Sequence, residues 1–485
     1  MIKSLRQPTP FMNMLTYGVG LVISKGAALI MLPIIANYLA PSQIGRLDLL
    51  ASIGAVAGIV VTFALHEALY RFVGEESDSK IRFQKASEIF SLTCVVSLIL
   101  SIVLFGYINI SFSHQFAFAS RTELNLILIC ASLEGIIGLS TAWLRMQDKA
   151  LTFLTVSVAS TLLQISLILG VLFSGPSVEK ILICGVITYL FQVVALLIIN
   201  RFKLVLNTTP AFRDYLRYGW PLMLTGLIGF GLNGAERFFV AYSTNLDTLG
   251  QYAIAIKFSF AMCILVQPFG MWWMPKRFNT LAVQGRRKTA EVTQLGIVYI
   301  TLLTVGVAFA AKAFILLALP ESYLLSAQLV LGTLLFSWFK EVAELLNIGI
   351  LHRKATKLQL SISVSATLIG LGMMWLLSGF GVWGIIGALC IAQAFKAVAV
   401  FIYSQKLTHL PYSLGLFVFE FNVLVLSLLL ALSMQNVWLC LGMAVIAPII
   451  CCLPAYRVEA VRDFVQQCGA KVISKFGTSS GHKPC

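Results

Sequence analysis

The chain has 485 residues, of which 59% are hydrophobic and 11% are charged. A soluble globular chain carries roughly a quarter charged residues, so this composition excludes a soluble protein and indicates a membrane protein. The formal net charge of +15 is also typical of nucleic-acid binders, but the predicted membrane topology accounts for most of it. We therefore expect no nucleic-acid partner.

Lys3 and Arg6 precede an apolar stretch that runs to about Leu39. This stretch is too long for the core of a secretory signal and lacks a clear A-x-A cleavage site, so we expect it to be retained as the first helix. The ten cysteines are scattered, without a CxxC pair or a neighbouring histidine cluster. They predict no metal site and are interpreted as small packing residues.

Further along the chain, uncharged runs of about twenty residues recur between Gly, Pro and charged residues. An apolar helix of that length crosses a hydrocarbon core of about 30 Å, so we predict an all-α polytopic membrane protein with about fourteen transmembrane helices. The predicted helices cover residues 12–36, 45–69, 87–108, 123–144, 150–173, 180–200, 217–242, 249–274, 292–318, 325–350, 358–378, 382–404, 413–433 and 437–456.

The basic residues fall mainly on one side of this topology. With the N-terminus in the cytoplasm, 26 of the 35 Lys and Arg residues lie on the cytoplasmic side. Four lie outside, namely Arg46, Arg121, Lys180 and Lys312. Five lie within spans, namely Lys25, Arg237, Lys257, Lys340 and Lys396. So strong a bias predicts that both termini are cytoplasmic. The external loops are short and offer few catalytic candidates, so we expect no enzyme.

The two halves of the chain repeat each other at a nearly constant offset of 201 to 206 residues. The matching pairs are Tyr17-Gly18 with Tyr218-Gly219, Ile44-Gly45 with Leu249-Gly250, Arg71-Phe72 with Arg277-Phe278, and Lys149-Ala150 with Lys354-Ala355. The offset spans six predicted helices, an even number, so both copies face the same way in the membrane. We predict six-helix lobes at 1–205 and 206–409, a helix pair at 410–456 and a basic cytoplasmic tail at 457–485.

Several short stretches resemble the multidrug/oligosaccharidyl-lipid/polysaccharide exporter superfamily, and specifically its Wzx-type polysaccharide flippases. The stretches are Leu32-Pro33, Tyr38-Leu39-Ala40-Pro41, Arg71-Phe72, Arg145-Met146-Gln147-Asp148-Lys149, Leu216-Arg217-Tyr218-Gly219-Trp220-Pro221, Glu236-Arg237-Phe238 and Leu249-Gly250-Gln251-Tyr252-Ala253. In relatives the acidic residue before the arginine is more often Asp, so Glu236 is a conservative departure that changes the geometry of this pair.

The resemblance implies a MATE-like, alternating-access transporter in the bacterial inner membrane. Its cargo would be an undecaprenyl-pyrophosphate-linked oligosaccharide repeat unit, carried from the cytoplasmic to the periplasmic leaflet before polymerisation into O-antigen, capsule or exopolysaccharide. Membrane lipids, the polysaccharide polymerase and the chain-length machinery are the implied partners. A cation-coupled multidrug exporter and a lipid II flippase remain alternatives on the same fold.

Cations buried in spans are the candidates for binding the pyrophosphate, because ionisable groups are expensive in a membrane and are functional hypotheses by default. We rank Lys25 and Lys340 first, followed by Arg237, Lys257 and Lys396. The alternative is that these cations merely pair with carboxylates, of which four lie in the same spans: Glu134, Glu236, Glu341 and Glu344. Lys340 and Glu344 are four residues apart, so a pair between them is expected.

No cofactor is expected other than a coupling proton or sodium ion. Proton coupling needs an acid in an apolar environment, and Glu134 is the best-placed candidate, with Glu236 as the second. Arg71 and Arg277 occupy equivalent points of the two lobes and are candidates for guiding the pyrophosphate at the cytoplasmic mouth. Their alternative interpretation is that of ordinary positive-inside anchors.

Overall fold

The computed structural model describes residues 26–27, 29–74, 76–111, 118–205 and 210–455. Over these residues the regular structure is helical. Ten helical stretches are long and apolar enough to cross a membrane, so the chain is a multi-pass membrane protein. The predicted cytoplasmic tail, 457–485, and Lys25 lie outside the described residues.

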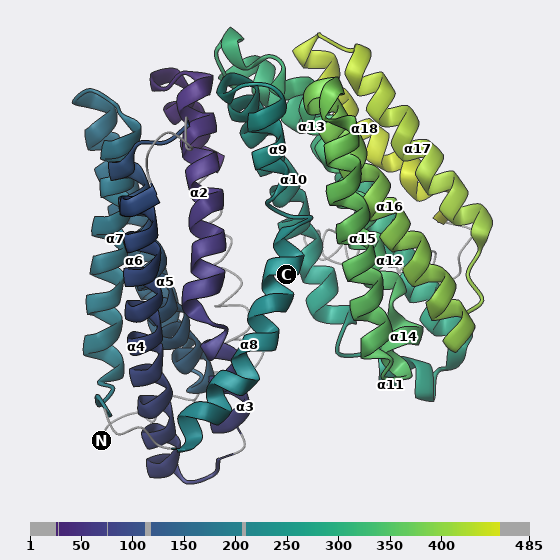
Figure 1. Cartoon of the computed structure of the whole chain (residues 1–485). Helices are drawn as coiled ribbons and strands as arrows, with labels where there is room; N and C mark the ends of the chain where they lie inside the picture. Colours follow the sequence, from purple (N-terminus) through teal and green to yellow (C-terminus); the bar gives the residue numbers. More distant parts are fainter. Residues whose placement is uncertain (1–25, 28, 75, 112–117, 206–209, 456–485) are drawn as a thin grey trace, which may run out of the picture. The chain divides into compact units, whose positions relative to one another are not determined.

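Two compact units divide the chain. The first contains residues 1–253 and 378–382, and the second contains 254–377 and 383–485. Within the first unit α4, α5, α6 and α7 run side by side as long helices, and α2 packs on α5 (Figure 1). The helices of this unit are α2 (Pro41–Thr62), α3 (Leu65–Gly74), α4 (Ser79–Ser111), α5 (Arg121–Met146), α6 (Ala150–Phe173), α7 (Val178–Asn200), α8 (Pro210–Phe230), α9 (Glu236–Ser243) and the 3-10 turn η2 (Ser378–Phe380).

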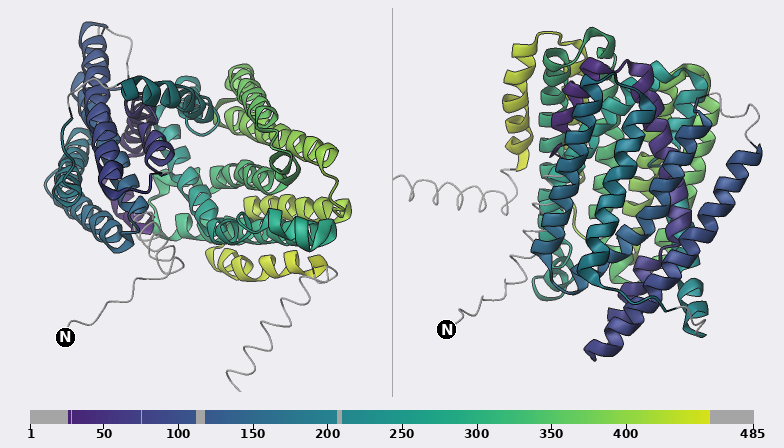
Figure 2. Two further views of the ribbon diagram at one scale, coloured as in Figure 1. Left: turned by 90° about the horizontal axis from the view of Figure 1, so that it is seen from below. Right: turned by 90° about the vertical axis from the view of Figure 1, so that its left-hand side faces the viewer.

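The second unit is built around α12. The C-terminal helices α17 and α18 both pack on α12, and Figure 2 shows them in yellow beside it in the end-on view. Helix α10 (Leu246–Trp273) begins in the first unit and continues into the second. The other elements are α11 (Arg277–Val283), α12 (Gly285–Ala318), η1 (Glu321–Tyr323), α13 (Ser326–Leu346), α14 (Ile348–His352), α15 (Thr356–Leu377), α16 (Gly381–Leu407), α17 (Leu414–Ser433) and α18 (Val437–Ala455).

Three of the predicted spans are broken helices within the described residues. The span predicted over 325–350 divides into α13 and α14 at Asn347. The span predicted over 45–69 divides into α2 and α3, because Phe63 and Ala64 have positive φ values of 50° and 52°. The span predicted over 217–242 divides into α8 and α9 at a turn that contains Gly231 and Gly234. Glycine disfavours a continuous helix, and the ring of Phe230 lies where a side chain on residue 234 would be. Hydropathy alone does not reveal such breaks.

One turn occurs twice, in the same form, at an offset of 206 residues. Asp148 and Lys354 both have left-handed backbone, with φ values of 54° and 55°. The backbone hydrogen bonds around them also correspond, namely Lys149 N to Leu144 O with Ala355 N to Ile350 O, and Ala150 N to Asp148 O with Thr356 N to Lys354 O. The helices that follow these turns, α6 and α15, begin at the same offset, as do α4 and α12.

A close helix crossing within the first unit joins equivalent residues of the two repeats. A Cβ atom on Gly45 of α2 would overlap the carbonyl oxygen of Leu246, and one on Gly250 of α10 would overlap the carbonyl oxygen of Pro41. The contact is reciprocal, as at a twofold axis, because Pro41 and Leu246 are also equivalent at the offset of 205. Only residues without a side chain permit the two backbones to approach in this way.

We expect Gly250→Ala to destabilise the protein by about 1–3 kcal/mol, since the added methyl group must displace backbone rather than a flexible side chain. Thermal unfolding of the purified protein in detergent measures this as a lower Tm. Gly387→Ala in α16 is the matched control, because a Cβ atom there meets no atom within 4 Å. Equal Tm values for the two variants would contradict the described crossing.

Candidate functional site

A buried ion triad lies one turn beyond the Gly45 crossing. The Arg237 guanidinium donates from Nε to Asp48 Oδ2 at 2.7 Å and from Nη1 to Glu236 Oε1 at 2.9 Å. Glu236 is 1% exposed and Arg237 is 8% exposed, so these charges depend on one another for compensation. Arg237, predicted as a ligand for the cargo, is therefore already held by two carboxylates.

Asp48 is the member of this triad that sequence reasoning missed. It stands only three residues into the predicted span 45–69, and a carboxylate at that depth is itself a signal of a buried partner. With both acids ionised, the triad carries one excess negative charge. It therefore suits a proton or another cation better than an anionic pyrophosphate.

Glu134 lies on α5, thirteen residues from its first residue and about 20 Å along the helix axis. Its carboxylate lies against the backbone of α2, where a Cβ atom on Gly58 would be 2.5 Å from Oε2. Cys130 and Tyr189 are the titratable side chains near it. Within the described part of the chain no hydrogen bond or ion pair joins Glu134 to another side chain.

In the second unit, Arg277 at the start of α11 is buried, with 8% exposed, and its partner is neutral. Its Nη1 donates to Asn347 Oδ1 at 2.9 Å, and its guanidinium carbon lies 4.8 Å from the ring centroid of Phe278. Among the described residues Nε has no hydrogen-bond acceptor. Burial lowers the pKa of Arg277, and the negative charge of Glu344 partly opposes that shift. Arginine stays charged in proteins, so Arg277 keeps a donor and a positive charge for an anion.

Glu344 connects Arg277 to Lys396 through Asn347. Asn347 Nδ2 donates to Glu344 Oε2 at 3.3 Å, and Lys396 Nζ donates to Glu344 Oε1 at 3.4 Å. The expected pair between Lys340 and Glu344 is not formed between these described residues, because Lys396 of α16 and Asn347 occupy the carboxylate instead. Lys396, another predicted ligand, is thus ion-paired.

Lys340 and Lys257 are both half-buried, on α13 and α10. Lys340 interacts electrostatically with Glu341, its neighbour in sequence, and with Cys263 of α10. Lys257 also has an interaction partner in the structure. Arg71 is exposed on α3 and likewise has a partner. The structure therefore places Arg277, Lys340 and Lys396 in one unit and Arg71, Glu134 and Arg237 in the other.

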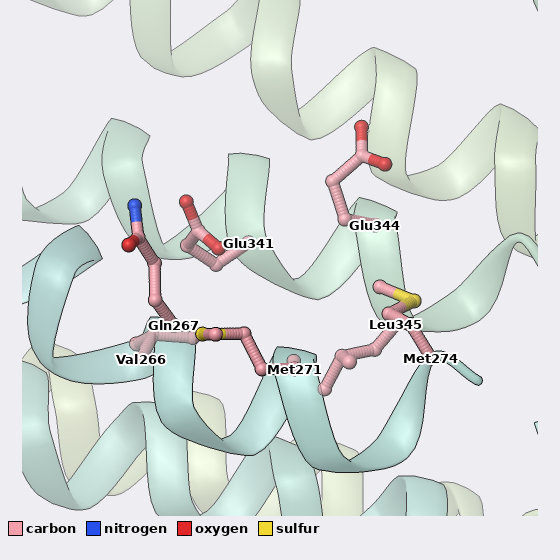
Figure 3. A pocket seen from close by; sticks show the side chains of 8 residues that line it. Val266, Gln267, Met271, Met274, Glu341, Glu344 and Leu345 are labelled. Carbon is pink, nitrogen blue, oxygen red and sulfur yellow. The ribbon is translucent and has the colours of Figure 1, made fainter. Parts of the chain in front are cut away.

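A pocket of about 290 Å³ lies between α10 and α13 of the second unit (Figure 3). In the close-up, the Gln267 amide and the Glu341 carboxylate project to the same side of this pocket. Its lining combines two carboxylates with apolar groups and consists of Val266, Gln267, Gly270, Met271, Met274, Glu341, Glu344 and Leu345. An acidic and apolar lining suits a lipophilic cation better than a free anion.

Lys312, one of the four basic residues predicted on the external side, is buried within the second unit. The residue is 3% exposed in α12, and its ammonium donates to the carbonyl oxygens of Ala431 and Leu432 in the last turn of α17. A cation at this position satisfies carbonyls that have no helical partner and opposes the negative end of the helix dipole.

Within the described residues no three His, Cys, Asp or Glu side chains are grouped closely enough to hold a metal ion.

The fold of this chain is similar to the folds of solved transporters. The fold is similar to that of the lipid II flippase MurJ in an inward closed conformation, with a TM-score of 0.69 and 14% identity over 91% of this chain and 99% of that chain. It is also similar to an inward-facing multidrug resistance MATE family transporter of the MOP superfamily, with a TM-score of 0.60 and 13% identity over 81% of this chain and 97% of that one. At these identities the similarity establishes the fold.

The sequence profile of the family described as "Polysaccharide biosynthesis protein" matches residues 11–278, and the chain belongs to this family. No curated protein sequence matches the chain. The family match and the fold together confirm the resemblance to the polysaccharide flippases of the MOP superfamily.

We expect Asp48→Asn to lower the free energy of unfolding by about 2 kcal/mol, since it removes a hydrogen-bonded charge from a buried arginine. The Tm of the purified protein, compared with wild type, measures the loss. Asp247→Asn is the control, because Asp247 is an exposed carboxylate in the first turn of α10. An unchanged Tm for Asp48→Asn would show that the triad does not stabilise the first unit.

Proposed function

We propose that this protein moves undecaprenyl-pyrophosphate-linked oligosaccharide repeat units from the cytoplasmic to the periplasmic leaflet of the bacterial inner membrane, for O-antigen, capsule or exopolysaccharide synthesis. Membership of the polysaccharide biosynthesis family supports a glycan cargo. Similarity to a lipid II flippase supports a lipid-linked one. The polysaccharide polymerase and the chain-length machinery are the proposed partners.

The proposal rests mainly on the environment of Arg277, a buried guanidinium bonded to a neutral side chain. The cargo is anionic at its pyrophosphate, and Arg277 is a buried guanidinium whose bonded partner is the neutral side chain of Asn347. The other well-defined buried arginine, Arg237, is neutralised by two carboxylates. A planar guanidinium with a free donor binds phosphate oxygens by charge-assisted hydrogen bonds. Arg277 is thus the proposed first contact for the pyrophosphate at the cytoplasmic mouth, supported by Lys340.

The membrane topology proposed here is fourteen crossings with both termini in the cytoplasm. One of the ten apolar stretches, 356–407, contains both α15 and α16. That stretch therefore provides two crossings. Three further crossings would bring the total to fourteen, namely the shorter apolar helices Leu29–Tyr38 and Val437–Ile449 and the broken helix formed by α8 and α9. The twice-occurring turn at Asp148 and Lys354 supports two parallel six-helix lobes, 1–205 and 206–409, followed by the pair 410–456.

An alternative is a cation-coupled multidrug exporter, and the pocket between α10 and α13 favours it. Two carboxylates and two methionines line this pocket, a combination that suits a lipophilic cation. A lipid II flippase is the third candidate on this fold. Deletion of the gene separates the three. Loss of a surface polysaccharide with accumulation of its lipid-linked unit supports our proposal, altered drug tolerance with intact glycan supports the exporter, and arrested cell-wall synthesis supports the lipid II flippase.

We expect Arg277→Gln, expressed in the deletion strain, to reduce surface polysaccharide by roughly 10-fold or more, since a charge-assisted hydrogen bond contributes about 1.5–3 kcal/mol. Arg287→Gln is the matched control, because the Arg287 side chain is 78% exposed and pairs with Glu291. Both variants are first shown to reach wild-type amounts in the membrane. Wild-type glycan levels in cells with Arg277→Gln would exclude the proposed contact.

We further propose Glu134 as the proton-coupling residue, because it is an acid in mid-helix without an ion pair among the described residues. We expect Glu134→Gln to abolish the dependence of transport on a pH gradient across proteoliposome membranes, and to slow transport under a gradient. Flipping of a fluorescent lipid-linked oligosaccharide measures both effects. Glu179→Gln, at the exposed start of α7, is the control. If Glu134→Gln keeps the wild-type pH dependence, another group carries the proton.

A further inference from the structure

A carboxyl group without a counter-charge lies between the C-terminal helices and the body of the second unit. Glu420 of α17 is 0% exposed, and neither of its oxygen atoms has a hydrogen-bond acceptor or donor within the described residues. Among the described residues, the hydroxyl of Thr301 on α12 is the polar group that interacts with it. The aromatic rings of Trp338 and Phe339 flank its neighbour Phe421, at 5.9 and 5.8 Å between centroids.

The hydrogen bonds of Thr301 determine which form of Glu420 this environment accepts. Thr301 Oγ1 donates its only proton to Ile297 O at 3.0 Å and accepts from Trp338 Nε1 at 3.0 Å. A hydroxyl has one donor and two acceptor lone pairs, so Thr301 has a single lone pair left to offer Glu420. An ionised Glu420 would be repelled by that lone pair. A protonated Glu420 can instead donate a hydrogen bond to it. The site therefore fits the neutral acid.

Within the described residues no ion pair from the elements that pack on α17 compensates Glu420. On α16, whose Phe401 packs on Phe417, Lys396 pairs with Glu344 and Lys406 lies over the Tyr403 ring. On α12, Lys312 is bound to carbonyls eleven residues further along α17, and the Tyr299 hydroxyl donates to Leu265 O of α10. On α13, Lys340 and Glu341 interact with Cys263 of α10. On α18, Cys440 is buried and faces Lys312. An ionised Glu420 here would be an unpaired buried charge, which is strongly unfavourable in an apolar interior.

Glu420 lies between two hydrogen bonds that hold α17 on α12 in a single register. Gln294 donates to Ser413 O and Lys312 donates to Ala431 O, each at a separation of 119 residues, and Thr301 and Glu420 are neighbours at the same separation. The two helices therefore run parallel over these three levels. Glu420 and Lys312 are the titratable side chains at these levels, and Lys312 is already bound to backbone carbonyls.

We propose that Glu420 is a proton-binding site that couples protonation to the packing of the C-terminal helix pair, α17 and α18, against α12. The carboxyl keeps its proton while α17 is packed. Loss of the proton favours separation of α17, because the carboxylate then gains water. Above the titration range of a water-exposed glutamate, at about pH 4.3, each pH unit disfavours the packed state by up to tenfold until the packed carboxyl itself ionises.

Two measurements on the full-length protein in lipid nanodiscs test this inference without assuming a cargo. Infrared difference spectra between pH 6 and pH 9 are expected to contain a band from a protonated carboxyl group at pH 6. This band should be present in wild type and in Glu321→Gln, and absent in Glu420→Gln. Glu321 is an exposed carboxylate of the same unit, at the start of η1. Amide hydrogen exchange in α17, normalised to the intrinsic rate at each pH, is expected to rise at least tenfold from pH 6 to pH 9 in wild type. The normalised exchange rate of α17 should stay constant from pH 6 to pH 9 in Glu420→Gln.

The inference is overturned if the band assigned to Glu420 is absent at pH 6, or if α17 exchanges with the same pH dependence in wild type and Glu420→Gln. Helix α7 of the first unit serves as the internal reference, and an equal rise there would mean general unfolding and would also overturn it. Glu420→Met, of similar length and without a titrating group, replaces Glu420→Gln if the latter does not fold. Failure of these tests leaves the proposed cargo unaffected, because neither measurement depends on transport.

Discussion

An ionised side chain inside a hydrocarbon slab must be paired, exposed to water, or neutral, and this constraint organises the polar interior of the protein. Arg237 satisfies it with Asp48 and Glu236, and Lys396 satisfies it with Glu344. Lys312 satisfies it with the last carbonyls of α17, which are themselves unsatisfied at a helix end. Each of these solutions also fixes which helices touch, because at least one partner in each lies on another helix.

The groups that do not meet this constraint by pairing are the informative ones. Arg277 is bonded to a neutral amide, Glu134 has no ion pair in the described part of the chain, and Glu420 has only a hydroxyl beside it. A cation without a counter-ion attracts an anion, whereas a carboxyl without a cation favours a proton. This difference is the basis for proposing Arg277 as a cargo contact and the carboxyl groups as proton sites.

Segments that correspond at an offset of 205 or 206 residues share backbone features but differ in charge. The turn at Asp148 recurs at Lys354, and Gly45 and Gly250 occupy equivalent places in one reciprocal crossing. Yet Glu134 and Lys340, equivalent at the offset of 206, have opposite charges. Multidrug transporters and a lipid II flippase share this fold. Function on it therefore depends on which charged side chains each copy carries.

The sequence by itself determined the membrane class, the helical architecture and the family, because hydropathy, flanking charge and backbone-restricted residues act locally or at a fixed spacing. It also identified Arg277, Glu134 and other charged residues in or near the predicted spans as the groups to consider. It did not reveal the breaks at Phe63 and at Gly231–Gly234, because a span that bends keeps the same hydropathy.

Only the tertiary structure decided which charges are neutralised. Asp48 reaches Arg237 from 189 residues away, and Lys396 reaches Glu344 from 52 residues away, displacing the local pair that spacing alone predicts for Lys340. The Coulomb energy of a pair depends on distance in space and on the surrounding dielectric, and neither is a property of the sequence spacing.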